Sequence, residues 1–146
     1  MLIESTRVRW STASAEGGGL LNNRGTAMLT DTLFAGNDAQ REGGGVEALE
    51  GKTNLVNVRL ENNNTGPMPS NGGGLHLIGA GLVTLLNGKV TGNSASNEGG
   101  GLWNSGTGQM FATSVVIEMN TAPKGPNVFN LGGTSLVDGT PVPVLP

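Results

Sequence analysis

The stretch Glu98-Gly99-Gly100-Gly101-Leu102 decides the fold, because it is one of four near-copies in a chain of 146 residues. The other three copies are Glu16 to Leu20, Glu42 to Val46 and Asn71 to Leu75. Their first glycines lie 26, 29 and 27 residues apart along the chain. A nearly constant spacing of a few tens of residues indicates one supersecondary unit that is copied and stacked.

A second landmark lies upstream of each glycine run, where an apolar residue stands three positions before a small polar residue. The apolar members are Val8, Phe34, Leu60, Val90 and Ile117, and the polar members are Ser11, Asn37, Asn63, Asn93 and Asn120. Near the C-terminus, the segment from Gly125 to Val128 replaces the glycine run. Because terminal repeats are commonly atypical, we interpret this segment as part of a degenerate last copy.

Each copy carries three short strand signals, which in the fourth copy are Leu102 to Asn104, Met110 to Thr113 and Val115 to Glu118. Alternation of apolar and polar residues between Gly and Asn is typical of strands, and no window sustains the spacing of a helix. Strands this short cannot bury a face alone, but stacked copies bond to one another. We therefore predict an all-β, right-handed parallel β-helix of about five coils, each with three strands in three parallel sheets.

The asparagines Asn37, Asn63, Asn93 and Asn120 have a structural reason to recur. A corner between strands leaves backbone polar groups unpaired, and each such group costs about 1–3 kcal/mol when it is buried. An Asn amide both donates and accepts hydrogen bonds, so it can serve its own coil and the next one. We predict an internal asparagine ladder at this corner and prefer it to a sugar-binding row.

Composition and charge exclude several classes of function. The net charge of −3 provides no basic surface for nucleic acid, and no apolar run approaches the ~20 residues that a membrane span needs. The chain has no cysteine, so disulfides and thiolate metal sites are excluded. The glycine runs lack the following Lys-Ser or Lys-Thr of a phosphate-binding loop. We expect no cofactor and no metal.

The segments Gly17 to Gly25 and Leu33 to Ala39 resemble the repeat of bacterial right-handed parallel β-helix proteins. The resemblance is strongest to the exported class with polymorphic-outer-membrane-protein-like repeats, and it extends to pectate-lyase-like β-helix repeats. It covers roughly residues 8 to 133. It implies the fold, and it implies functions that range from adhesins and surface stalks to polysaccharide lyases and hydrolases. The matching residues form turns and core, so the resemblance transfers no catalytic residue.

The column directly after the first apolar residue of each coil is the place where chemistry is expected. Coil by coil, this column reads Leu21, Glu47, His76, Trp103 and Phe129. If the register is right, a carboxylate, an imidazole and an indole stand outward on consecutive rungs about 5 Å apart. Glu47 and His76 are then the candidate catalytic residues, and His76, Trp103 and Phe129 are the candidate ligand-binding residues for a glycan. The alternative is an amphipathic strip covered by a loop, a tail or a neighbouring molecule.

A weaker alternative is an ice-binding face, because Thr26, Thr53 and Thr134 fall in one predicted column. Gly81 and Gln109 interrupt that column, whereas an ice-matching face needs an unbroken array.

We expect a single domain, with a partial coil or cap at 1–15, coils at 16–133, and a last strand with a Pro-rich tail at 134–146. The exposed strand edges of the end coils favour self-association, and the prolines of the tail favour a segment that folds back or leads into a linker. Met1 to Ser5 lacks the pattern of a signal peptide, so we expect an export signal outside this sequence. The expected function is a non-catalytic structural or adhesive segment of a secreted or cell-surface bacterial repeat protein. The alternative is a carbohydrate-binding or glycan-processing module, which as an enzyme would be a polysaccharide lyase or a glycoside hydrolase.

Overall fold

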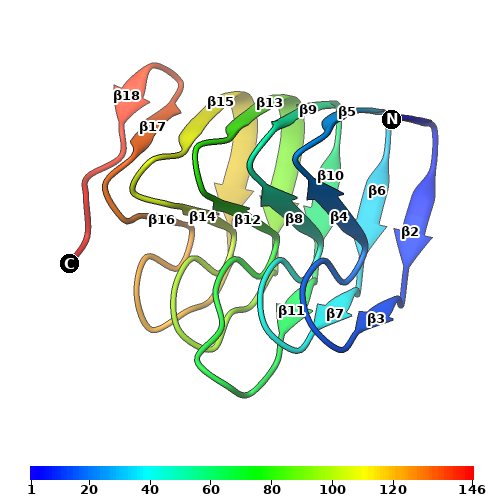
Figure 1. The fold of residues 1–146 in the computed structure, drawn as a ribbon, viewed down its shortest axis with the longest axis horizontal. Coiled ribbons are helices and arrows are strands. Elements are labelled where there is room, and N and C mark those ends of the chain that lie inside the picture. Colours follow the sequence, from blue (N-terminus) through cyan, green and yellow to red (C-terminus); the bar gives the residue numbers. More distant parts are fainter.

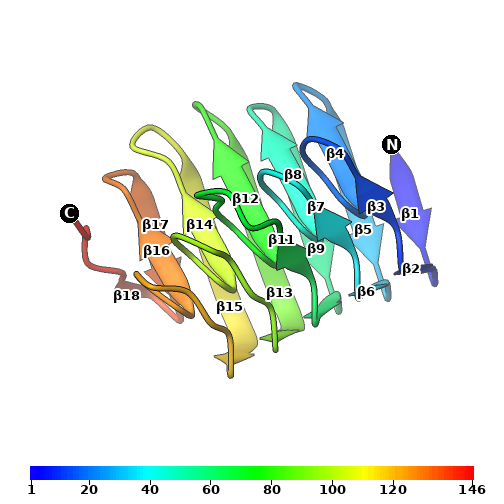
Figure 2. The same ribbon diagram turned by 90° about the horizontal axis from the view of Figure 1, so that it is seen from below.

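The computed structural model describes residues 1–146, which form eighteen strands and no helix (Figure 1). The chain therefore has no helix that is long and apolar enough to cross a membrane. Successive coils stack in chain order from the N-terminal to the C-terminal end (Figure 2). The architecture is the predicted all-β parallel β-solenoid of about five turns, because almost every strand pairs in parallel with its equivalent in the next coil.

The strands that follow the glycine runs form one five-stranded parallel sheet. Its members are β4 (Leu20–Asn23), β8 (Val46–Leu49), β12 (Leu75–Ile78), β14 (Leu102–Asn104) and β16 (Val128–Asn130). Their first residues pair directly with one another, so the register of the glycine runs continues into the strands. Val128 takes its place in this ladder, which confirms the segment around it as part of a last copy.

The second and third strands of the coils belong to one ten-stranded sheet. The second strands are β1 (Leu2–Glu4), β5 (Thr26–Thr30), β9 (Lys52–Val56) and β17 (Thr134–Val137), and the third strands are β2 (Arg7–Arg9), β6 (Leu33–Ala35) and β10 (Arg59–Glu61). In the copies that begin at Asn71 and Glu98, both strands merge into β13 (Leu82–Thr91) and β15 (Gln109–Glu118).

The merging differs from the prediction of separate sheets for the second and third strands. A single residue with positive φ turns the chain in each long strand, Asn87 in β13 and Ser114 in β15. Pairing resumes at the next residue, so the bend interrupts the ladder only briefly. The third sheet is instead a small one at the following corner, made of β3 (Thr12–Ala13), β7 (Asp38–Ala39) and β11 (Asn64–Thr65).

The core is a column of apolar residues at equivalent positions of successive coils. Phe34, Leu60 and Val90 are fully buried, as are Val46, Leu75 and Leu102. The equivalent residues of the end coils, such as Val8 and Ile117, are only partly buried against this core. The apolar landmark residues and the apolar residues after the glycine runs therefore form two inward columns, with weaker burial where no further coil covers them.

The asparagine ladder is present and is continuous through four coils. The Nδ2 groups of Asn37, Asn63 and Asn93 each donate to the Oδ1 of the Asn in the next coil at 2.9 Å. Each Nδ2 also donates to a backbone carbonyl of the preceding coil, as Asn63 does to Phe34 at 3.1 Å. At the C-terminal end, Asn120 donates to the Oδ1 of Asn127, which supplies the acceptor that a further ladder residue would provide.

Each glycine of a run is required for a different reason, as the run from Gly99 to Gly101 shows. Gly99 has a φ of +61°, and a Cβ there would lie 2.8 Å from the Cβ of Trp103. A Cβ on Gly100 would lie 2.6 Å from the carbonyl carbon of Thr121 in the next coil. A Cβ on Gly101 would lie 2.9 Å from the ladder amide of Asn120. The run is therefore needed for a close passage of the backbone, and no helix follows it.

A second set of buried asparagines lies at the end of the first strand, and the sequence reading missed it as a structural feature. Asn22 donates to the hydroxyl oxygen of Thr53 at 2.9 Å, and Asn104 donates to that of Ser135 at 2.9 Å. Asn130 donates to the carbonyl of Gly133 at 3.0 Å. Asn22 and Asn104 therefore tie the end of a first strand to the second strand of the next coil, and Asn130 ties it to the turn that follows it.

The register of the threonines differs from the predicted ice-binding column. Thr26 pairs with Lys52, whereas Thr53 pairs with Ala27 and is fully buried. The actual outward column reads Thr26, Lys52, Leu82, Gln109 and Thr134. The prediction was wrong by one residue, and such a shift moves a side chain to the opposite face of a sheet.

The two ends of the solenoid are built differently. At the C-terminal end, β18 (Thr140–Pro141) pairs antiparallel with β17, and Leu145 donates its backbone N–H to the carbonyl of Asn130 at 3.0 Å. The tail therefore folds back over the last coil, which is the first of the two alternatives expected from its prolines. At the N-terminal end, Met1 to Ala13 forms a partial coil, and its strands β1, β2 and β3 each have one unpaired edge.

The ladder yields a stability prediction. Replacing Asn63→Ala removes the acceptor for both the backbone N–H and the Nδ2 of Asn37, and it removes the donor to the carbonyl of Phe34. We expect the free energy of unfolding to fall by about 3 kcal/mol or more, measured by urea denaturation. Asn64→Ala is the matched control, because Asn64 is exposed. Equal losses in the two variants would contradict the ladder.

Candidate functional site

The predicted column forms on the face of the five-stranded sheet opposite the core. Leu21 pairs with Glu47, Glu47 with His76, His76 with Trp103, and Trp103 with Phe129. Successive side chains of a strand point to opposite faces of the sheet. Each residue of the column directly follows an inward residue, as His76 follows Leu75, so the side chains of the column point away from the core. We call Glu47, His76, Trp103 and Phe129 the stacked strip.

Neighbouring side chains of the stacked strip are in direct contact. The Nδ1 of His76 lies 3.0 and 2.9 Å from the two carboxylate oxygens of Glu47. The ring of His76 stacks on that of Trp103, with centroids 4.3 Å apart and planes inclined by 27°. Trp103 and Phe129 are nearly parallel, with centroids 6.2 Å apart. The column is thus a continuous row of polar and aromatic contacts between four coils.

The stacked strip is covered, although it lies outside the core. Glu47, His76, Trp103 and Phe129 expose 2%, 1%, 6% and 0% of their surface, respectively. The first glycine of each run lies against the strip residue of its own coil, as Gly99 does against Trp103. Glu98, one residue earlier, accepts a hydrogen bond from the indole Nε1 of Trp103 at 3.1 Å. The faces of these rings are therefore occupied by neighbouring side chains and backbone.

The electrostatics of the strip are dominated by burial of the Glu47 carboxyl. Burial raises the pKa of Glu47 above its ordinary value of 4.5, because the charged form loses hydration. The hydrogen bond and the charge of His76 lower the pKa of Glu47 in part, and the carboxylates of Glu42 and Glu16 raise it further. The net direction is upward, so Glu47 keeps its proton to a higher pH than an exposed glutamate.

The strip opens to solvent only near its N-terminal end. Leu21 is 45% exposed, and it borders a pocket of about 240 Å³ that Glu16, Glu42 and Glu47 also line. No group of three or more His, Cys, Asp and Glu side chains in the chain is arranged to hold a metal ion. A hydrogen-bonded Glu–His pair can hold or exchange a proton, and it is the one titratable pair that the strip contains.

Sequence reasoning placed the four strip residues in one column but missed the residues that cover them. Glu42 and Glu98 precede glycine runs, and each lies near the strip residue of its own coil. The signal was present, because glutamate precedes the glycine run in three of the four copies. Sequence reasoning also passed over Trp10, which is 79% exposed and lies on the backbone of Gly36.

No protein-family model, no curated protein and no solved structure matches this chain. The assignment to the parallel β-solenoids therefore rests on the repeat pattern together with the observed architecture.

The buried carboxyl yields a pH prediction. Because folding raises the pKa of Glu47, the unfolded chain releases this proton at a lower pH than the folded chain does. The wild type should therefore lose stability relative to Glu47→Gln as the pH rises above 4.5, by up to about 1.4 kcal/mol per pH unit. Urea denaturation of both proteins between about pH 4 and pH 7 measures the difference. A wild type that gains stability relative to Glu47→Gln over this range would show that the direction is wrong.

Proposed function

We propose that the chain is a non-catalytic structural or adhesive segment of an exported or cell-surface bacterial repeat protein with polymorphic-outer-membrane-protein-like β-helix repeats. The proposal rests on the contacts and the burial of the side chains that could otherwise bind a ligand or transfer a proton. Glu47, His76 and Trp103 contact one another across coils and are almost completely covered. Their contacts stabilise the stacking of one coil on the next, which is the role expected in a structural repeat protein.

The ends of the solenoid support a role in extended assemblies. Ile3, Val8 and Leu20 of the first coils are only partly buried, and β4 has no partner on its outer edge. A further coil or a second copy of the chain would cover these residues and pair with these edges. The folded-back tail closes the opposite end. Self-association through the terminal coils is therefore proposed at the N-terminal end.

The alternative function is a carbohydrate-binding or glycan-processing module that uses Glu47, His76, Trp103 and Phe129. A sugar that stacks on an aromatic ring needs one open ring face. Trp103 is 6% exposed and has His76 on one side and Phe129 on the other. Binding there would require Trp103 to separate from His76 or Phe129, so the geometry favours the structural role.

One experiment separates the two functions. In the first assay, the purified chain is incubated with a panel of neutral and acidic polysaccharides, and newly released chain ends are measured. In the second assay, the fluorescence of the Trp10→Phe variant is recorded with the same polysaccharides, because Trp103 is then the only tryptophan that emits. We expect that no chain ends are released. We also expect that no glycan shifts the emission of Trp103 and that acrylamide quenches this emission poorly, because the indole is covered.

Turnover that disappears in Glu47→Gln would contradict the structural proposal and favour the enzyme. A glycan-dependent shift of the Trp103 emission would favour the binding module. Trp103→Phe is the matched control, because it retains the exposed Trp10, whose emission acrylamide should quench readily.

A further inference from the structure

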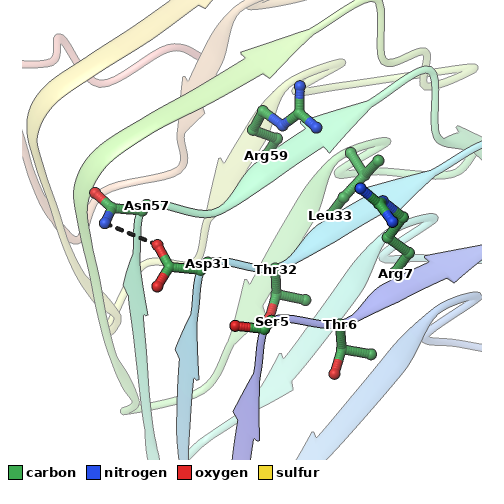
Figure 3. Close-up of a pocket in the computed structure, with 8 residues that line it drawn as sticks. All are labelled: Ser5, Thr6, Arg7, Asp31, Thr32, Leu33, Asn57 and Arg59. Atoms are coloured by element: carbon green, nitrogen blue, oxygen red, sulfur yellow. Dashed lines mark hydrogen bonds between the residues drawn. The ribbon is translucent and has the colours of Figure 1, made fainter.

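The pocket beside Leu21 differs from the polar pocket drawn in Figure 3, which lies at the bend between the second and third strands. At the bend, Thr32 and Leu33 are only 2% and 4% exposed, so little of their surface is open to a ligand. The pocket beside Leu21 has a volume of about 240 Å³ on the outer face of β4, β8 and β12. We call it the amphiphilic pocket, because its lining includes three carboxyl and three aliphatic side chains, those of Glu16, Glu42, Glu47, Leu21, Leu49 and Ile78.

We propose that the amphiphilic pocket binds an aliphatic ammonium ion, meaning a protonated primary amine on a short alkyl chain. The ammonium group would lie against Glu42 and Glu16. The alkyl chain would lie against Leu21, Leu49 and Ile78. A free alkylamine and the lysine side chain of a partner both carry this group. The inference goes beyond the proposed structural role and does not depend on it.

Glu42 is a carboxylate that the chain leaves without a cation. Glu16, Glu42 and Glu98 each precede a glycine run and therefore occupy equivalent positions in their coils. The carboxylate of Glu16 lies 3.7 Å from the guanidinium group of Arg41, and that of Glu98 lies 3.9 Å from the ammonium group of Lys124. Glu42 forms no ion pair. A bound ammonium ion would give Glu42 the kind of partner that its equivalents have.

Glu47 forms the floor of the pocket and is under-satisfied as an acceptor. It is 2% exposed, and its carboxylate has one donor, the Nδ1 of His76. Because a carboxylate offers about four acceptor positions, most of this capacity has no partner. The charges of Glu42 and Glu16 also raise the pKa of Glu47, so the three carboxyl groups are close enough to repel one another. A cation against Glu42 would relieve that repulsion.

The aliphatic side of the pocket is open to solvent. Leu21 and Ile78 are 45% and 39% exposed, and Leu49 is partly exposed between them. Leu49 of β8 pairs with Ile78 of β12, and Leu21 lies one coil earlier on β4. These side chains therefore span two rungs, which corresponds to about 10 Å along the axis of the solenoid. An alkyl chain laid across them would remove apolar surface from water.

The combined lining selects the chemistry of the ligand. A neutral alkyl compound would cover the aliphatic surface but would leave Glu42 without a cation. An inorganic cation would leave the aliphatic surface in water, and the chain has no group of three or more His, Cys, Asp and Glu side chains arranged to hold a metal ion. An alkylammonium ion satisfies both parts of the lining, because its N–H groups donate to carboxylate and its chain covers the leucines.

NMR titration of the isotope-labelled full chain at pH 7 and low ionic strength tests the inference. The first three probes share a six-carbon chain and differ in charge, namely hexylammonium, hexan-1-ol and hexanoate. We expect hexylammonium to shift the backbone amide signals of Leu21, Glu42 and Ile78. Hexan-1-ol and hexanoate should bind at least about tenfold more weakly, because neither pairs with carboxylate. Ethylammonium should also bind at least about tenfold more weakly, because it covers less aliphatic surface.

A lysine derivative blocked at both its amino and carboxyl ends distinguishes the two sources of the ammonium group. Affinity equal to that of hexylammonium would identify a partner's lysine as a ligand that the pocket accepts. Affinity at least about tenfold weaker would identify the free alkylamine as the ligand, because the backbone of the lysine then does not fit beside the pocket.

Glu42→Gln should weaken hexylammonium binding at least about tenfold, because it removes the charge and keeps the shape of the side chain. Glu118→Gln is the matched control, because Glu118 is exposed on β15 and the variant changes the net charge equally. It should bind like the wild type. Leu21→Ala should weaken hexylammonium but leave ethylammonium nearly unchanged. Circular dichroism confirms that all variants fold.

Four results would each overturn the inference. The first is that hexylammonium does not bind, and the second is that its signal shifts lie away from the pocket. The third is that hexan-1-ol or hexanoate binds as tightly as hexylammonium. The fourth is that Glu118→Gln loses as much affinity as Glu42→Gln, since the attraction would then come from the net charge of the chain alone.

Discussion

Hydrogen bonding between equivalent residues of successive coils is the interaction on which this structure depends. Each ladder asparagine donates to the asparagine of the next coil and to a backbone carbonyl of the preceding coil, so the ladder forms only if every coil advances by the same step. Differences in length between copies must therefore lie outside the ladder. The longest spacing between glycine runs accommodates its extra residues in the segment 66–70, where Pro67, Met68 and Pro69 are exposed. The core, the sheets and the glycine runs all follow from this constant step.

The same register governs the face opposite the core. Side chains that share a column are brought into contact whether they point inward or outward, so Glu47, His76, Trp103 and Phe129 stack as closely as the core residues do. The first glycine of each run lies against the base of the strip side chain four residues later, and the strip is at most 6% exposed. A column of side chains that points away from the core of a solenoid can therefore still be buried from solvent. In this chain an open polar pocket lies instead at the bend beside Arg7 and Arg59, where Arg59 is 3.6 Å from the carboxylate of Glu61.

Much of the fold could be predicted because the repeat period fixes the register at many positions at once. The inward residues Phe34, Leu60 and Val90 and the asparagine ladder follow from that period alone. The merging of the second and third strands was not predictable from the bend residue, because Asp31 and Asn57 turn the chain with the same positive φ as Asn87 in coils where the two strands stay separate. The set formed by Asn22, Asn104 and Asn130 was missed because Ala48 and Leu77 interrupt it. For the candidate site, the column was predictable, but its burial was not, because contacts such as the hydrogen bond from the Trp103 indole to Glu98 depend on how the preceding turn folds back.

The most direct test of the account is an NMR measurement on the side-chain amides of Asn37, Asn63 and Asn93 in the isotope-labelled chain. All three residues are completely buried, and their amides are bonded from coil to coil. The account predicts slow exchange of these amide protons with solvent, and nuclear Overhauser contacts between the amides of Asn37 and Asn63 and between those of Asn63 and Asn93. Rapid exchange of these protons, or the absence of contacts between successive asparagines, would contradict it.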